Sequence, residues 1–226
     1  MSILFFLVFL LVMIALTIIA RYFWGKDALF VVGIGCVIGA NIYNSTTFPI
    51  ELGVLTFGFD SVLYTVFSFC MIVMYIDYGR SSFNTLLYSS ISSILLSSFF
   101  LFVANLSSFG FSVGLLLSFL SYIFSIIGTF AAIWVMRCVF DALQKRNVNI
   151  YVNLLVCLFL ASLINSLIYF GLTFVVQLNL GDEFWFSLLG SYVGKFVTIG
   201  FCLFAYFLNQ VLQKRRQDNL SKLDNL

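Results

Sequence analysis

The chain contains no histidine, one proline and very few charged side chains. Only 9% of its 226 residues are charged, whereas an ordinary soluble domain has roughly 25%. Hydrophobic residues make up 62%. So few charges exclude an ordinary soluble domain, and the composition predicts an integral membrane protein with many spans and short connections.

The lack of histidine also limits the chemistry that the chain offers. A zinc site is not expected, because the cysteines stand singly in apolar segments and none forms a CxxC pair. A Ser–His pair is excluded and no two carboxylates are predicted at mid-membrane, so we expect no enzyme, no metal and no cofactor. We interpret the cysteines as buried and unreactive; they are Cys36, Cys70, Cys138, Cys157 and Cys202.

Long apolar runs dominate what is present. Each of seven runs is near or above the length that crosses about 30 Å of hydrocarbon, and none alternates as a barrel strand does. The first has no basic region before it, so we interpret it as a helix rather than a signal peptide. The sequence predicts an all-α integral membrane protein, a polytopic bundle of about seven transmembrane helices, over residues 3–20, 28–48, 61–76, 84–104, 111–136, 150–177 and 184–212.

The basic residues favour one orientation of these spans. Ten of the eleven lysines and arginines fall on one side, and the loops of the other side hold Glu51, Asp60, Asp182 and Glu183. The positive-inside rule makes the basic side cytoplasmic, so we expect an external N-terminus and an internal C-terminus. Residues 1–213 would form the transmembrane domain. Residues 214–226 would form a basic cytoplasmic tail, which we interpret as disordered and in contact with anionic lipid.

Lys195 is the basic residue that does not fit this pattern. It lies in "SYVGKFVTIGFCLF", roughly 16 Å along a helix from Phe184, which is too deep for easy snorkelling. A charge at bilayer depth costs at least about 2.5 kcal/mol. All acidic residues stand at predicted span ends, so no carboxylate partner is expected. We predict that Lys195 faces a polar cavity and binds substrate, with backbone carbonyls, an amide or a ligand as its partner; bonding to carbonyls for packing alone is the alternative.

Three asparagines add polar groups inside the predicted spans. Asn41 and Asn44 stand three residues apart on one face of the second span, and Asn165 is in the middle of the sixth. A buried amide offers two donors and an acceptor, which suits the edge of a nitrogen heterocycle or a neighbouring helix. For any single asparagine a hydrogen bond between helices is the more ordinary interpretation. Together with Lys195 they favour a polar cavity.

Four stretches of the chain, taken in order, carry a family likeness: "RYFWGKDALFVVGIGCVIGANIY", "ELGVLTFGFDSVLY", "DYGR" and "SYVGKFV". They resemble the vitamin uptake-like transporter (VUT) family, which includes queuosine-precursor transporters. The resemblance implies a helical bundle in the plasma membrane of a prokaryote that imports a 7-deazaguanine precursor of queuosine. It also implies that Tyr192 and Lys195 belong to the substrate site, with Ser162 at a further polar position of the family.

Neutral residues stand at several positions where this family usually carries polar or acidic ones. This chain replaces a Thr–Asp pair of the family, an acidic residue before the Tyr-Gly turn, a Gln, and two Asp residues of the last two spans. These departures favour a solute, or a mode of binding, that needs fewer carboxylates. The replacing residues are Met71, Ile72, Ile76, Ser162, Asn165 and Ser191.

Two other functions remain open beside import of a small heterocyclic solute. One is the substrate-binding subunit of an energy-coupling-factor importer, although the small-xxx-small spacing of such subunits is missing from the first span, where Ala15 and Ala20 stand five apart. The other is a structural or sensory membrane subunit that transports nothing. The expected partners are the lipid bilayer and a small solute, with no nucleic acid; a homo-oligomer is left open.

Overall fold

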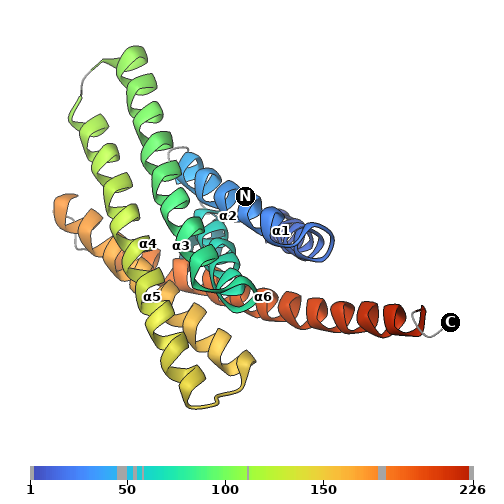
Figure 1. Cartoon of the computed structure of the whole chain (residues 1–226). Coiled ribbons are helices and arrows are strands. Elements are labelled where there is room, and N and C mark those ends of the chain that lie inside the picture. The colour runs from blue at the N-terminus through green and yellow to red at the C-terminus, as the bar shows by residue number, and fades with distance from the viewer. Residues whose placement is uncertain are drawn as a thin grey trace.

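The computed structural model describes residues 3–44, 50–52, 55–57, 59–110, 112–177 and 182–223. These residues form long helices and one short hairpin (Figure 1). The elements are α1 (Ile3–Trp24), α2 (Lys26–Asn44), β1 (Ile50–Leu52), β2 (Leu55–Phe57), α3 (Phe59–Phe109), α4 (Val113–Lys145), α5 (Ile150–Gln177) and α6 (Asp182–Leu223).

The helices have the length and the surface of a membrane bundle. Large apolar side chains are exposed on the outside of the helices, among them Leu11, Phe100 and Phe196, as is expected where lipid replaces water. These features confirm the predicted all-α membrane protein. Within the described ranges, five stretches are long and apolar enough to cross a bilayer: Leu7–Trp24, Asp60–Ser108, Leu115–Lys145, Ile150–Val176 and Leu188–Arg215.

Helix α3 is interrupted at Gly79. Its 51 residues would measure about 77 Å as one straight helix, more than twice the thickness of the hydrocarbon core. Gly79 has φ 77° and ψ −176°, which is not helical. The two parts of α3 correspond to the segments predicted over 61–76 and 84–104. Counted this way, the helices match the seven predicted segments in order, but the number of membrane crossings stays a prediction.

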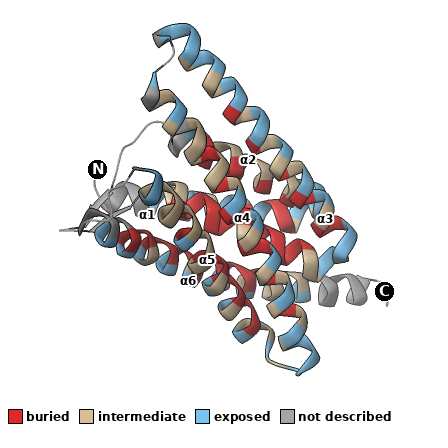
Figure 2. Ribbon diagram, turned by 90° about the vertical axis from the view of Figure 1, so that its left-hand side faces the viewer, coloured by how far each residue is buried: buried red, intermediate tan, exposed pale blue. Residues whose placement is uncertain are grey.

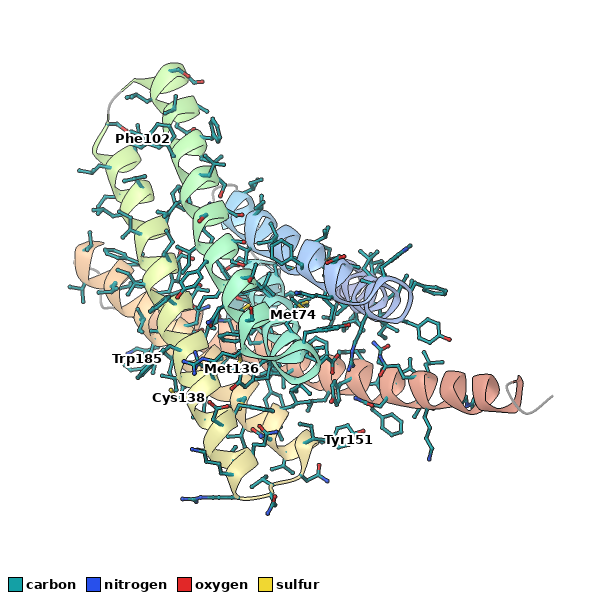
Figure 3. All side chains as sticks on the ribbon, viewed as in Figure 1. Met74, Phe102, Met136, Cys138, Tyr151 and Trp185 are labelled. Atoms are coloured by element: carbon teal, nitrogen blue, oxygen red, sulfur yellow. The ribbon has the colours of Figure 1, made fainter. Side chains whose placement is uncertain are left out.

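The first part of α3 lies at the centre of the bundle. Every residue from Ser61 to Met74 except Ser68 is buried, and Figure 2 shows the buried residues gathered where the helices meet. Met74 and Met136, from α3 and α4, are both fully buried in this region (Figure 3). α2 packs mainly against α3, and α4 against α5, while α6 contacts α1, α3 and α5. A helix that is apolar on all sides is typical of such a central position.

The hairpin lies just before α3 and packs against α6. β1 and β2 are antiparallel, with Ile50 opposite Phe57 and Leu52 opposite Leu55, and β2 contacts α6. This connection between the second and third predicted spans is expected to be a loop, and the two three-residue strands form a short hairpin within it. Its consequence is that the start of α3 is held beside α6.

The last helix is longer than the sequence analysis predicts. α6 continues through the basic stretch to Leu223, and in Figure 1 its C-terminal part extends away from the other helices. The expectation of a disordered tail from residue 214 is therefore wrong as far as Leu223. Six charged residues follow Gln213, so the polar sequence extends the helix beyond its apolar part.

Candidate functional site

Lys195 lies inside the bundle, where α6 meets α5. It is 5% exposed, and its Nζ donates a 2.6 Å hydrogen bond to Oγ of Ser166 on α5. A hydrogen bond from a charged donor is about twice as strong as a neutral one, which partly offsets the cost of removing the ammonium from water. Lys195 has three N–H donors, and this bond uses one of them.

Serine hydroxyls from three helices meet beside Lys195. Oγ of Ser166 lies 3.4 Å from Oγ of Ser191 on α6. Oγ of Ser191 in turn lies 3.1 Å from Oγ of Ser61 on α3. All three serines are buried. They form a row of hydroxyls that joins α5, α6 and α3 and that starts at the ammonium group.

Asp60 supplies the carboxylate that the sequence analysis does not expect. It stands in the first turn of α3, next to Ser61, and it is half-buried along the same cavity as Lys195. The two charges interact across the cavity but form no direct ion pair in the described part of the chain. The expectation that Lys195 has no carboxylate nearby is wrong, because the hairpin brings the start of α3 into the bundle.

The cavity between these groups is narrow and mixed in character. The free space is about 290 Å³, but only about 10 Å³ can hold the centre of a water-sized sphere. That is room for about one water molecule. Tyr64 and Ser125, whose oxygens are 2.5 Å apart, join α3 to α4 at its wall. The lining residues are Asp60, Tyr64, Ser125, Asn165, Ser166, Tyr169, Phe170, Ser191 and Lys195.

Asn165 lines this cavity, as predicted, and Gly128 of α4 makes room for it. A Cβ atom at Gly128 would lie 2.9 Å from Oδ1 and 3.2 Å from the backbone oxygen of Asn165. Real Cβ atoms are essentially never found below 3.0 Å from such a neighbour. The glycine therefore lets α4 approach α5 closely at the level of the site, and it leaves room for the amide of Asn165.

Tyr192 and Ser162 are close to the site but do not line the cavity. The hydroxyl of Tyr192 donates a 3.2 Å hydrogen bond to the carbonyl oxygen of Leu163, which ties α6 to α5. Ser162 is buried one turn before Ser166 on α5. In this structure both residues support the helices that carry Lys195 and Ser166, rather than facing the cavity themselves.

The structure places Asn41 away from the cavity. Its Nδ2 donates to Oγ of Ser97 at 2.6 Å and to Oγ of Ser98 at 3.0 Å, both on the second part of α3. This is the interhelical hydrogen bond of the more ordinary interpretation, and the assignment of Asn41 to the substrate site stays a prediction. The side chain of Asn44 lies outside the described residues, and its assignment stays a prediction.

Several cavity residues were missed by sequence reasoning. Asp60 stands at a predicted span end, and Ser166 and Ser191 look like ordinary small residues of apolar helices. One weak signal was available: Ser191 and Lys195 are four apart, and so are Ser162 and Ser166, so each pair shares a helix face. The aromatic residues Tyr169 and Phe170 gave no signal in a chain with 29 phenylalanines.

A second group of polar side chains lies nearer the C-terminal end of α6 than Lys195. We call it the Arg21 cluster, and it consists of Arg21, Asp77 and Tyr206. Nε and Nη2 of Arg21 donate to the two carboxylate oxygens of Asp77 at 2.8 and 2.9 Å. The Arg21 side chain is 1% exposed and that of Asp77 19%. The guanidinium carbon lies 4.9 Å from the ring centre of the buried Tyr206. The cluster joins α1, α3 and α6.

The cysteines are mostly as predicted. Four of them are buried, but Cys138 on α4 is exposed, so that part of the interpretation is wrong (Figure 3). Its sequence context is apolar, but its position on α4 faces outward. Among the described residues no group of three His, Cys, Asp or Glu side chains is placed to hold a metal ion.

No family model, curated protein or solved structure matches the chain.

Proposed function

We propose that the protein is a transporter that takes a small polar heterocycle across the membrane, with the Lys195 cavity as its binding site. The supporting observation is the pair Asp60 and Lys195, which line one cavity inside a membrane bundle without bonding to each other directly. Ionisable side chains are costly within a membrane and usually mark a pathway for a substrate or an ion. A solute bound between Asp60 and Lys195 would give each of these side chains a hydrogen-bonding partner.

The chemistry of the lining residues supports a heterocycle with both donors and acceptors on its edge. Asp60 accepts hydrogen bonds, Lys195 donates them, and the amide of Asn165 does both. Tyr169 and Phe170 add aromatic surface on the same wall. The resemblance to the VUT family points to a 7-deazaguanine precursor of queuosine. Asp60 supplies one carboxylate for the N–H face of such a ring, so recognition needs fewer acidic residues than the family usually has.

The size of the cavity limits how a solute can bind. Typical small-molecule pockets have about 300–1,000 Å³, whereas this one has room for about one water molecule. A bicyclic ring therefore enters only if the helices around the cavity separate. The structure corresponds on this proposal to a closed state, and uptake requires at least one other arrangement of the bundle.

The test uses a bacterium that lacks both queuosine synthesis and its own precursor importer. The chain is expressed there, the precursor is supplied at low and high concentration, and queuosine in tRNA is measured. We expect rescue that is incomplete at low concentration, because a carboxylate of the family is replaced by Asn165. Lys195→Met should abolish rescue, and the exposed Lys145→Met is the matched control that should not. No rescue at any concentration, with the protein present in the membrane, would contradict the proposed solute.

The orientation of the bundle is part of the proposal, with the basic side in the cytoplasm of a plasma membrane. Reporter fusions after Gln213 should give a cytoplasmic signal, and fusions near Asp182 an external one. The reverse result at either position would contradict the orientation.

A further inference from the structure

The Lys195 cavity and the Arg21 cluster lie along one buried face of α6. Lys195, Cys202 and Tyr206 are seven and four residues apart, spacings that keep side chains on the same side of a helix, and all three are buried. Tyr206 lies eleven residues after Lys195, which is about 16 Å along the helix. This buried face of α6 therefore joins the cavity to the Arg21 cluster.

Three thiols fill the layer between the two polar groups. Cys36 on α2, Cys70 on α3 and Cys202 on α6 are each at most 1% exposed. The thiol of Cys70 is close enough to the other two for their charges to interact if ionised. This layer is closed and apolar in the structure, and beyond it the Arg21 cluster ties α1, α3 and α6 together.

The ion pair of the Arg21 cluster is a contact that can be broken at moderate cost. The desolvation of a buried pair largely cancels the attraction between its charges, so the cost of separation is moderate where opening lets water reach both of them. In addition, Nη1 of Arg21 is buried with no hydrogen-bond partner among the described residues. A pair with an unsatisfied donor favours the closed arrangement less than a fully bonded pair would.

A joint lies immediately beside this pair. Asp77 is two residues before Gly79, whose φ of 77° interrupts α3. A Cβ atom at Gly79 would meet nothing within 4 Å, so close packing does not require the glycine. The backbone conformation does require it, because side chains disfavour positive φ. Asp77 therefore stands at the end of the first part of α3, next to the residue at which the chain changes direction into the second part.

We propose that the Arg21 cluster is a gate that closes the route from the Lys195 cavity toward the basic side of the protein. The gate opens when Arg21 and Asp77 separate and the two parts of α3 turn about Gly79. As a gate for a solute it rests on the proposed function. Its opening, however, is measurable without any solute, since it exposes Cys70 and Cys202.

The experiment measures thiol labelling in inside-out vesicles with a negatively charged, membrane-impermeant maleimide. Cys138 is first replaced by serine, and the labelling rate of each remaining cysteine is followed by mass spectrometry. We expect Asp77→Asn to raise the rates at Cys70 and Cys202 about tenfold or more, because weakening the pair enlarges the open population. In right-side-out vesicles the same variant should give no rise.

Two controls separate gating from general loosening. Cys157 is buried between α4 and α5, where it donates to the carbonyl of Met136, and its rate should not change. Asp141 on α4 accepts a 2.6 Å hydrogen bond from the hydroxyl of Tyr75, so Asp141→Asn is the same substitution outside the cluster. The proposal is wrong if Cys70 and Cys202 stay protected, if Cys157 reacts equally fast, or if Asp141→Asn has the same effect.

A double variant keeps the test informative if Asp77→Asn does not fold. Arg21→Met with Asp77→Leu replaces the pair by apolar side chains of similar size, which buried positions often accept. We expect this variant to stay closed, with Cys70 and Cys202 as protected as in the unchanged protein. Labelling of both thiols at about ten times the original rate would instead overturn the proposal. Because neither variant needs a solute, failure of the uptake test and failure of this one are independent.

Discussion

The Lys195 cavity and the Arg21 cluster each hold one basic and one acidic side chain, but the charges touch only in the cluster. Arg21 and Asp77 form two hydrogen bonds shorter than 3 Å, whereas Lys195 bonds to a serine and faces Asp60 across a cavity. A direct pair contributes to the free energy of folding as a unit. A separated pair leaves hydrogen-bonding capacity for a third molecule. On our proposals, the separated pair binds a solute and the direct pair closes the route to it.

Removing one charge from each region should give the largest difference between the two in the free energy of unfolding. Arg21→Leu leaves Asp77 without its partner, and we expect the free energy of unfolding to fall by about 3–5 kcal/mol, near the lower value because Asp77 is partly exposed. Lys195→Met should change it by less than about 1 kcal/mol, since the lost hydrogen bond is offset by the removal of a buried charge. Thermal unfolding in detergent measures both. A strongly unstable Lys195→Met protein would mean that Lys195 serves packing.

Double-mutant cycles sharpen the same comparison. The cycle of Arg21→Leu and Asp77→Leu should give a coupling energy of about 1–3 kcal/mol, as expected for side chains in direct contact. The cycle of Lys195→Met and Asp60→Asn should give a smaller coupling energy, about 0.5–1 kcal/mol, because these charges interact across the cavity without touching. Both are measured by unfolding under the same conditions. Equal coupling in the two cycles would show that Asp60 and Lys195 are paired.

A substitution at Gly128 should disturb the cavity and leave the cluster alone. In Gly128→Ala the new methyl group would overlap Asn165, so α4 and α5 must shift, at a cost of about 1–3 kcal/mol. Gly171→Ala on α5, which meets nothing within 4 Å, is the matched control and should change stability by less than about 1 kcal/mol. Unfolding and precursor uptake are both measured. If both variants behave alike, Gly128 does not position Asn165.

The converse change at Gly79 should affect the cluster and not the cavity. Gly79→Ala finds open space but must adopt φ 77° and ψ −176°, a region almost restricted to glycine, which costs an alanine about 1–3 kcal/mol. Gly35→Ala, at a helical position with equally open surroundings, is the control and should cost nothing. Thermal unfolding again gives the measurement. A Gly79→Ala protein as stable as the control would contradict the interruption of α3 at this residue.

Hydropathy was sufficient to predict the helices. It did not predict which charged side chains of different helices form pairs. The segment predicted over 150–177 coincides with α5 (Ile150–Gln177), because a continuous apolar run in a membrane can only be a helix. Arg21 and Asp77 were counted only as charges near the basic side or at a span end. They are 56 residues apart, and nothing local in the sequence indicates that they meet.

Sequence reasoning predicted the site residues whose burial follows from their position along one apolar helix. It missed the residues that reach the cavity through the packing of several elements. Lys195 is buried because it stands in the middle of an apolar run. Asp60 is a terminal residue of its helix, and it reaches the cavity only because the hairpin turns the chain back against α6. Asn41 and Asn165 are the same residue type in similar surroundings, yet one packs against serines and the other lines the cavity.

The length of α6 gives the cavity a mechanical connection to the far end of the chain. The helix runs from Asp182 to Leu223, and the 28 residues from Lys195 to Leu223 form a lever of about 42 Å. If α6 tilts by about 10° when a solute fills the cavity, Leu223 is displaced by about 7 Å. A fluorescent label at the C-terminus would then report events at Lys195 from outside the membrane.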